Sequence, residues 1–267
     1  MQDIAGTDDK LIGRKDGAVG HVIFNNPDRH NAVSLDMWQA MSAVMDEFLA
    51  DEDIRVLVVS GAGDKAFVSG ADISKFESER ATKDAVAAYS AASRAAYDRL
   101  YNFPKPTLAR IQGYCIGGGA ALAMCCDLRV CNQSASFGIP AAKLGLGYGY
   151  DGLKRLSDIV GVSRAMEMFY TARRFSAREA YEMGLVNACV PDDELDDVVN
   201  GITARIGENA PLTIAAIKRA AREIGKNPED RNLDELADMV QACFDSQDYI
   251  EGRRAFMEKR KPVFKGH

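Results

Sequence analysis

Short apolar runs rich in β-branched residues alternate with turns and helical stretches along the chain before Pro191. Runs of this length and composition are typical of buried strands. They predict strands at residues 21–25, 55–60, 107–111 and 128–131. A stripe of large apolar side chains predicts a helix over residues 34–50, with the stripe in the core and Ser34 as its cap. The stripe consists of Trp38, Met41, Met45 and Phe48.

After Pro191 the strand pattern ends and the sequence becomes almost wholly helical. Apolar stripes predict further helices at residues 192–206, 211–224 and 233–244. This change of pattern predicts a mixed α/β core followed by a helical C-terminal region. We place the two regions at residues 1–195 and 196–267.

A run of three glycines, Gly117 to Gly119, separates a strand pattern from small helix-forming residues. The glycines would start a helix whose first amides have no intrahelical partner and carry the positive end of the helix dipole. Bare backbone of this kind can hold a developing negative charge, and one such donor is worth about 3 kcal/mol to a transition state. The pattern therefore indicates an oxyanion hole, although the glycines alone are equally compatible with a turn that serves close packing.

A second apolar run, residues 66–68, also ends in a turn of small residues, Ser69 to Ala71, which Asp72 follows. Two backbone donors from two loops could thus converge on one oxygen atom. Asp72 is interpreted as an Asx-turn or helix-cap residue that braces its loop, with no part in the chemistry.

The composition is that of a globular protein of 267 residues with a net charge of −6 and a pI near 5.2. An acidic chain argues against nonspecific binding to nucleic acid or to anionic membranes, which depends on clustered Lys and Arg. No apolar stretch reaches the length of a membrane span. We therefore expect neither nucleic acid nor a membrane as a partner.

The six cysteines lack the paired spacing of a zinc site, and the chain has only three histidines. We expect no metal site. Four of the cysteines fall in apolar runs, where a free thiol behaves as a small hydrophobic group. Residues 1–4 lack the charged leader that precedes the apolar core of a signal peptide. These features predict a reduced, cytoplasmic protein.

Residues 147–152 satisfy the spacing G-x-G-x-x-G of a dinucleotide-binding loop. That fingerprint requires a preceding apolar strand, and residues 141–146 have no strand pattern. A loop that leads into a helix from Gly152 fits the sequence better.

The glycine run and residues 66–73, together with residues 26–32 (NPDRHNA) and 251–264, resemble the crotonase superfamily of acyl-CoA enzymes, which includes enoyl-CoA hydratases and isomerases. The resemblance extends over nearly the whole chain. It implies an α/β fold in which a crotonase-like spiral of ββα units, residues 1–195, carries the acyl-CoA site. It also implies that residues 196–267 form a trimerisation region that covers the coenzyme A (CoA), in a homotrimer or a dimer of trimers.

The resemblance places the two oxyanion donors at the amides of Ala71 and Gly118, which would hold the carbonyl oxygen of an acyl-CoA thioester as an enolate forms. Coenzyme A would enter as part of the substrate, with no prosthetic group. Phe256 and Lys259 would approach the nucleotide from a neighbouring subunit; a core position for Phe256 and a solvated charge for Lys259 are the alternatives. The CoA-contacting residues so implied are Arg29, His30, Gly70, Ala71, Asp72, Ile73, Phe256 and Lys259.

The sequence departs from the hydratases of this superfamily at their acid and base. Those enzymes deliver water with two glutamates, and the matching positions here are Ala121 and Ala141. Neither alanine can transfer a proton, so hydration by a glutamate pair cannot operate in this chain. The single-glutamate isomerase mechanism also fails, because its position is Ala141.

Groups that could replace the glutamates lie in one loop: Lys143, Tyr148, Tyr150 and Asp151. Methylmalonyl-CoA decarboxylases of the superfamily carry a tyrosine at the position of Tyr148. Decarboxylation needs no base, because loss of carbon dioxide generates the enolate and a weak acid suffices to protonate it. Dehalogenating and dienoyl-isomerising relatives use an aspartate of this loop; their position matches Gly149, and Asp151, two residues later, is a second candidate. A packing role for Tyr148 and an N-cap role for Asp151 are the structural alternatives.

These observations predict an enoyl-CoA hydratase/isomerase family protein that acts on a CoA thioester through a stabilised enolate, with a nonstandard acid and base. Two alternatives stay open at this point. One is a decarboxylase of a malonyl-type CoA that uses Tyr148 as its proton donor. The other is a noncatalytic acyl-CoA-binding homologue in which the two alanines record lost chemistry.

Overall fold

The computed structural model describes residues 2–3, 9–72 and 82–267, with side chains from residue 9 onward. The larger sheet is antiparallel at its first edge and parallel from β3 onward. Its strands, in spatial order, are β1 (Gln2–Asp3), β2 (Leu11–Asp16), β3 (Val19–Phe24), β4 (Val56–Gly61), β6 (Thr107–Ile111), β8 (Leu128–Asn132) and β11 (Ala188–Val190).

The smaller sheet is parallel except for its first pair of strands. In spatial order it consists of β10 (Phe175–Ser176), β9 (Ser136–Gly138), β7 (Tyr114–Ile116) and β5 (Ala66–Val68). The α-helices are α1 (Leu35–Ala50), α3 (Lys83–Tyr101), α4 (Gly118–Cys125), α5 (Tyr150–Val160), α6 (Val162–Thr171), α7 (Ala177–Glu182), α8 (Leu195–Gly207), α9 (Pro211–Ile224), α10 (Leu233–Asp245) and α11 (Gln247–Glu258). Short 3-10 helices are η1 (Pro27–Arg29), η3 (Pro140–Leu144) and η4 (Pro228–Asp230).

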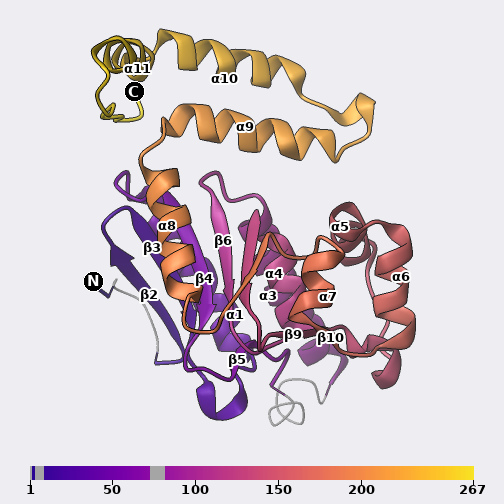
Figure 1. Ribbon diagram of the computed structural model, residues 1–267. Coiled ribbons are helices and arrows are strands. Elements are labelled where there is room, and N and C mark those ends of the chain that lie inside the picture. Colours follow the sequence, from indigo (N-terminus) through magenta and orange to yellow (C-terminus); the bar gives the residue numbers. More distant parts are fainter. Residues whose placement is uncertain (1, 4–8, 73–81) are drawn as a thin grey trace.

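The chain winds between the two sheets in a repeating order. β4, β6 and β8 each add a strand to the larger sheet, and the strand that follows each of them, β5, β7 and β9, joins the smaller sheet. α3 follows the first of these pairs and α4 the second, so each turn is a ββα unit (Figure 1). This arrangement confirms the predicted α/β fold built as a spiral of ββα units.

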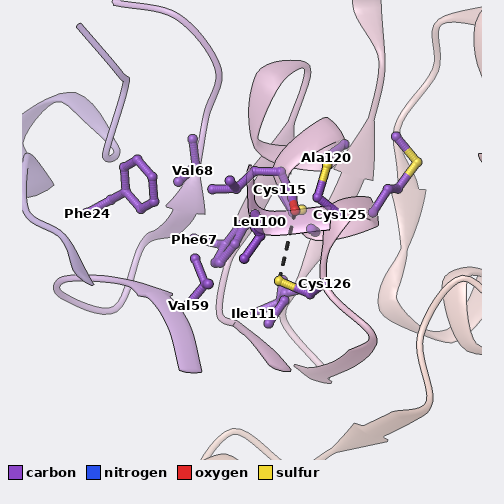
Figure 2. Packing of buried hydrophobic residues seen from close by; sticks show 14 of the residues in the cluster. Phe24, Val59, Phe67, Val68, Leu100, Ile111, Cys115, Ala120, Cys125 and Cys126 are labelled. Atoms are coloured by element: carbon purple, nitrogen blue, oxygen red, sulfur yellow. Dashed lines mark hydrogen bonds between the residues drawn. The ribbon is translucent and has the colours of Figure 1, made fainter. Parts of the chain in front are cut away.

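The main core fills the space among the two sheets and helices α1, α3 and α4. Figure 2 shows part of it, including Phe67, Val68 and Cys115 of the smaller sheet and Cys126 directly after α4. The predicted apolar stripe of the first helix is confirmed, because all four of its side chains are buried. A second, smaller cluster lies on the other face of the larger sheet, where Leu195 and Val199 of α8 cover it.

The predicted strands and helices are found with small shifts at their ends. Ser34 occupies the N-cap position of α1, but its hydroxyl makes no capping hydrogen bond and is buried with no partner among the described residues. The helix expected from Gly152 begins earlier, at Tyr150, and Gly149 is its N-cap. The alternative interpretation of Asp151 as an N-cap is therefore wrong, since this residue lies inside the first turn of α5.

Helices α9, α10 and α11 lie together on one side of the α/β core, and α8 leads to them (Figure 1). The boundary predicted at residue 195 falls at the first residue of α8 and stays a prediction. α9 contacts the core through a buried charged cluster, in which Lys218 and Arg222 each pair with Asp127 at 2.7 Å. Among the described helices, none is both long enough and apolar enough to cross a membrane.

A carboxylate near the C-terminus should make stability depend on acidic pH. Glu251 accepts hydrogen bonds from Arg260 at 2.6 Å and from the Val263 amide at 3.0 Å, and these lower its pKa to about 2. Because its folded pKa lies below the ordinary 4.5, its stabilising effect is present above pH 4.5 and is lost as the pH falls toward about 2. We expect Glu251→Gln to lower the melting temperature at neutral pH, with a difference from wild type that shrinks below pH 4.5. A difference that stays constant down to the acid limit would contradict this account.

Candidate active site

A cavity of about 500 Å³ opens between α3, α4, the segment around η3 and the start of α5. The turn after β5 and the turn before α4 form one part of its wall. The cavity therefore joins the two glycine-bearing segments that the sequence singled out to the loop that holds the proposed acid and base.

The two glycine turns touch each other. A Cβ built on Gly118 would lie 3.7 Å from Gly70 Cα, and one built on Gly70 would lie 3.7 Å from the Gly118 nitrogen and 3.4 Å from the Ile116 oxygen. A Cβ on either glycine would thus be in van der Waals contact with the backbone of the other turn, so no side chain separates the turns. The structure thus brings together the segments in which the sequence analysis expected two converging amides.

The backbone pairing beside the first turn sets the direction of the Ala71 amide. Val33 donates its amide to the Gly70 carbonyl at 2.8 Å and accepts from the Asp72 amide at 3.0 Å. Ala71 lies between these two partners, so in this parallel bridge its own amide points to the side away from Val33. An amide oriented in this way is available to a ligand.

The second turn depends on two of its glycines. Gly117 has a φ of +55°, a conformation that favours glycine, and it precedes α4 directly. Gly119 packs so closely on β5 that a Cβ would fall 1.9 Å from the Val68 oxygen. Gly118 is the first residue of α4, and its amide has no acceptor within the helix. The glycine run thus seats a helix N-terminus directly on the smaller sheet.

Aromatic residues that the sequence did not indicate as part of the site line the cavity beside this turn. Tyr97 of α3 donates its hydroxyl to the Gly118 carbonyl at 3.1 Å, and its ring meets that of Trp38 edge-on at 5.0 Å. Trp38 donates to the Tyr89 hydroxyl at 3.0 Å, and both rings line the cavity. Trp38 is thus a core residue, as predicted, and also part of the site.

Ala121 and Ala141, where the resemblance led us to expect the hydratase glutamates, both line the cavity. Ala121 lies one turn after Gly118 on α4, and Ala141 lies in η3 and is buried. Each contributes a methyl group to the wall where a carboxylate would be needed for proton transfer.

Tyr148 lines the cavity with a hydroxyl that has no hydrogen-bond partner in the described part of the chain. Its ring packs edge-on against Phe169 with centroids 4.5 Å apart and lies so close to Gly152 that a Cβ there would meet it at 2.5 Å. Although 39% of the residue is exposed, burial among these neighbours raises the pKa of its hydroxyl to about 12. Tyr148 is therefore protonated at neutral pH and can act as an acid but not as a base.

The other three candidate acid and base groups are either ion-paired or outside the cavity. Asp151 lines the cavity, but its carboxylate is held by Arg94 at 2.8 Å. Tyr150 is 74% exposed, and neither it nor the exposed Lys143 contributes to the cavity wall. The structure thus brings Tyr148 and Asp151 to the cavity and leaves the other two outside it.

A charged cluster accompanies Asp151, and the sequence analysis missed it. Arg155 of α5 pairs with Asp98 of α3 at 2.6 Å, and Arg94 lies 3.8 Å from the same carboxylate. All of these side chains line the cavity. Arg94 and Asp98 are one helical turn apart within 83–101, a spacing that could have indicated a polar face on this helix.

The segments expected to contact CoA lie side by side. Ser69 donates its amide to the His30 carbonyl at 3.1 Å and its hydroxyl to the Arg29 carbonyl at 3.4 Å. His30 packs edge-on against Tyr114, and the Arg174 guanidinium lies 4.9 Å from the centre of that ring. Arg174 is a cation near the expected CoA path that the sequence analysis did not name.

The remaining expected CoA contacts are not gathered at this cavity. Ile73 lies outside the described residues. Phe256 and Lys259 lie on α11 and at its end, beside α10 and away from the cavity of the same chain (Figure 1). Their approach to a neighbouring subunit stays a prediction. In the described part of the chain, no group of three or more His, Cys, Asp or Glu residues could hold a metal ion.

Comparison with known proteins agrees with this geometry. The family model described as enoyl-CoA hydratase/isomerase matches residues 14–267. A crotonyl-CoA hydratase of Syntrophomonas wolfei is 35% identical over 260 residues, which are 96% of this chain and 98% of the relative. A carnitinyl-CoA dehydratase of Escherichia coli is 34% identical over 256 residues, which are 94% and 97% of the two chains.

A solved structure supports the same assignment. An enoyl-CoA hydratase/carnithine racemase of Magnetospirillum magneticum superposes with a TM-score of 0.92 at 35% identity, covering 98% of this chain and 97% of its own. Fold and cavity thus define a protein of the crotonase superfamily. Within that superfamily, the chain belongs to the enoyl-CoA hydratase/isomerase family.

Proposed function

We propose that this protein acts on a CoA thioester through an enolate whose oxygen is held by the amides of Ala71 and Gly118. The observation that carries the proposal is that the turns at Gly70 and Gly118 touch each other and both line the cavity. Preorganised amides in such a position stabilise charge without reorganising during the reaction.

The described lining of this cavity does not support hydration by two glutamates. Among the described residues, the carboxylates that line it are Asp98 and Asp151, and each is paired with an arginine. Ion pairing stabilises the charged form of a carboxylate and weakens it as a base. The described lining therefore favours a reaction that needs no carboxylate base.

Decarboxylation of a malonyl-type CoA meets this condition. The bond between the α-carbon and the carboxylate breaks, carbon dioxide leaves, and its electron pair forms the enolate. Tyr148 then donates its proton to the α-carbon and recovers a proton from solvent. Its raised pKa of about 12 keeps the proton in place at neutral pH, and its unpaired hydroxyl can turn toward a ligand.

The oligomer is proposed on the evidence of the C-terminal helices. They line an open groove of about 1170 Å³ with apolar walls, and Phe244, Phe256 and Met257 expose large apolar surfaces there. Surfaces of this kind are typical of subunit contacts. We therefore retain the homotrimer, or the dimer of trimers, as the assembly.

One experiment separates the reaction classes. Enoyl-, malonyl- and saturated acyl-CoAs are incubated with the protein in deuterated water and followed by mass spectrometry. Loss of carbon dioxide from a malonyl-type thioester is the expected result. Gain of water by an enoyl thioester would contradict the proposed reaction, and α-deuteration alone would support the oxyanion site but not the decarboxylation. Binding of every thioester without conversion would identify a noncatalytic acyl-CoA-binding protein.

The role of Tyr148 can be tested by removing its hydroxyl. We expect Tyr148→Phe to lower decarboxylation by about 100-fold, because a positioned acid contributes at least that factor. The matched control is Tyr150→Phe, which changes an exposed tyrosine at the start of α5, two residues later and outside the cavity. Equal turnover in the two variants would show that Tyr148 only packs against Phe169.

A further inference from the structure

One face of α4 forms a track along the cavity. Gly118, Ala121 and Met124 all line the cavity, at helical spacing. At the end of α4, Arg155 donates to the Cys125 sulfur at 3.4 Å. The seven steps from Gly118 to Cys125 extend about 10 Å along the helix. An acyl chain whose carbonyl lies at Gly118 and which follows α4 therefore reaches Arg155 and its neighbour Arg94, which we call the arginine cluster.

The carboxylates that pair with Arg94 and Arg155 use only some of the N–H donors of these two arginines. Arg155 is fixed by Asp98, by Cys125 and by the ring of Tyr101, which lies 4.5 Å from its guanidinium. Arg94 donates a hydrogen bond to Asp151 alone within the described chain, so most of its N–H donors can serve a ligand. Arg94 is also 73% solvent-exposed on its side chain, which leaves it free to rotate toward the cavity.

We propose that this cavity accepts acyl groups that end in a carboxylate, and that Arg94 receives this terminus in competition with Asp151. The inference rests on the proposed function, because it requires the thioester carbonyl to lie at Gly118. The proposed function concerns only the carbons next to the thioester. The present inference adds the chemical class of the far end of the acyl group.

The chemistry of the lining favours a carboxylate over an apolar terminus. A methyl group placed against Arg94 and Arg155 would remove water from two cations and return no hydrogen bond. A carboxylate accepts charge-assisted hydrogen bonds from a guanidinium in a matching planar geometry. It can replace Asp151 as the partner of Arg94 with no change in the number of ion pairs.

The proposal is tested by binding, so that it does not depend on turnover. Octanoyl-CoA and suberoyl-CoA have the same number of carbons and differ in ending in a methyl group or a carboxylate. Both are saturated, and their dissociation constants are measured by calorimetry for the wild type and three variants. Arg94→Gln removes the proposed receptor, and Asp151→Asn removes its competitor. Arg99→Gln is the control, because Arg99 lies on the same helix but pairs with Asp46 of α1.

We expect the wild type and Arg99→Gln to bind suberoyl-CoA about fivefold more tightly than octanoyl-CoA, the size of one exposed charge-assisted contact. Arg94→Gln should abolish this preference, and Asp151→Asn should increase it. Equal binding of the two thioesters by the wild type, or a preference that survives in Arg94→Gln, would overturn the proposal. A preference that follows this pattern in a protein that converts no thioester would support the inference and reject the proposed function. Failure of both thioesters to bind would overturn both.

Discussion

Replacing Gly118 by proline should lower turnover by at least about 100-fold while the protein stays folded. The substitution removes one backbone N–H, and loss of a single oxyanion donor costs this factor or more. Proline is well tolerated at the first position of a helix, which Gly118 occupies in α4. The residue before it, Gly117, has no Cβ to clash with the proline ring. The measurement is the rate of α-deuteration or decarboxylation of the thioester that the protein converts, with circular dichroism to verify folding.

Gly118→Ala is the matched control for this experiment. It retains the N–H and adds a methyl group 3.1 Å from the Tyr97 hydroxyl, which a small rotation of that side chain can relieve. We expect Gly118→Ala to lose less than about tenfold in rate, since the donor is intact. If the alanine variant lost as much activity as the proline variant, crowding of the cavity and not loss of the amide would explain both results.

The oxyanion turns could be found from the sequence because their chemistry is carried by the backbone. Glycine by itself indicates exposed backbone amides, whatever the neighbouring side chains are. The chain has glycines of this kind at Gly117 to Gly119 and at Gly70. The structure then places these turns in contact, with a Cβ on Gly119 only 1.9 Å from the Val68 oxygen. Their ligand, and hence the roles of Ala71 and Gly118, stay predictions. The strands and the apolar stripe of α1 were predictable for a similar reason, because periodicity is a local property.

The charged cluster in the cavity could not be found in this way. Arg94 and Asp98 lie on α3, whereas Asp151 and Arg155 lie on α5, more than fifty residues later. Either pair alone is an ordinary helical surface, and only the packing of α3 and α5 around one cavity combines them. The same limitation explains why Asp151 was a plausible base in the sequence and is an ion-paired group in the structure.

The second large effect that we expect is on stability. It arises from a buried charge at the junction of the core and the C-terminal helices. Asp127 accepts hydrogen bonds from the Thr107 amide at 2.8 Å, from Lys218 at 2.7 Å and from Arg222 at 2.7 Å. Lys218 is only 9% exposed, and burial lowers its pKa, which the facing Asp127 carboxylate opposes. Arg222 also packs on the ring of Tyr101 at 3.9 Å. Asp127 thus holds α9 against the core.

We expect Asp127→Asn to destabilise the protein by about 3 kcal/mol, because it leaves the buried charge of Lys218 without its counterion. Asparagine also offers one acceptor oxygen where the carboxylate offers two, so it cannot satisfy all three donors. The free energy of unfolding is measured by urea titration. The matched control is Asp158→Asn, which breaks the solvent-exposed pair between Lys154 and Asp158 and should cost less than about 0.5 kcal/mol. Equal losses in the two variants would mean that Lys218 is hydrated without Asp127 and that α9 is held to the core by its apolar contacts alone.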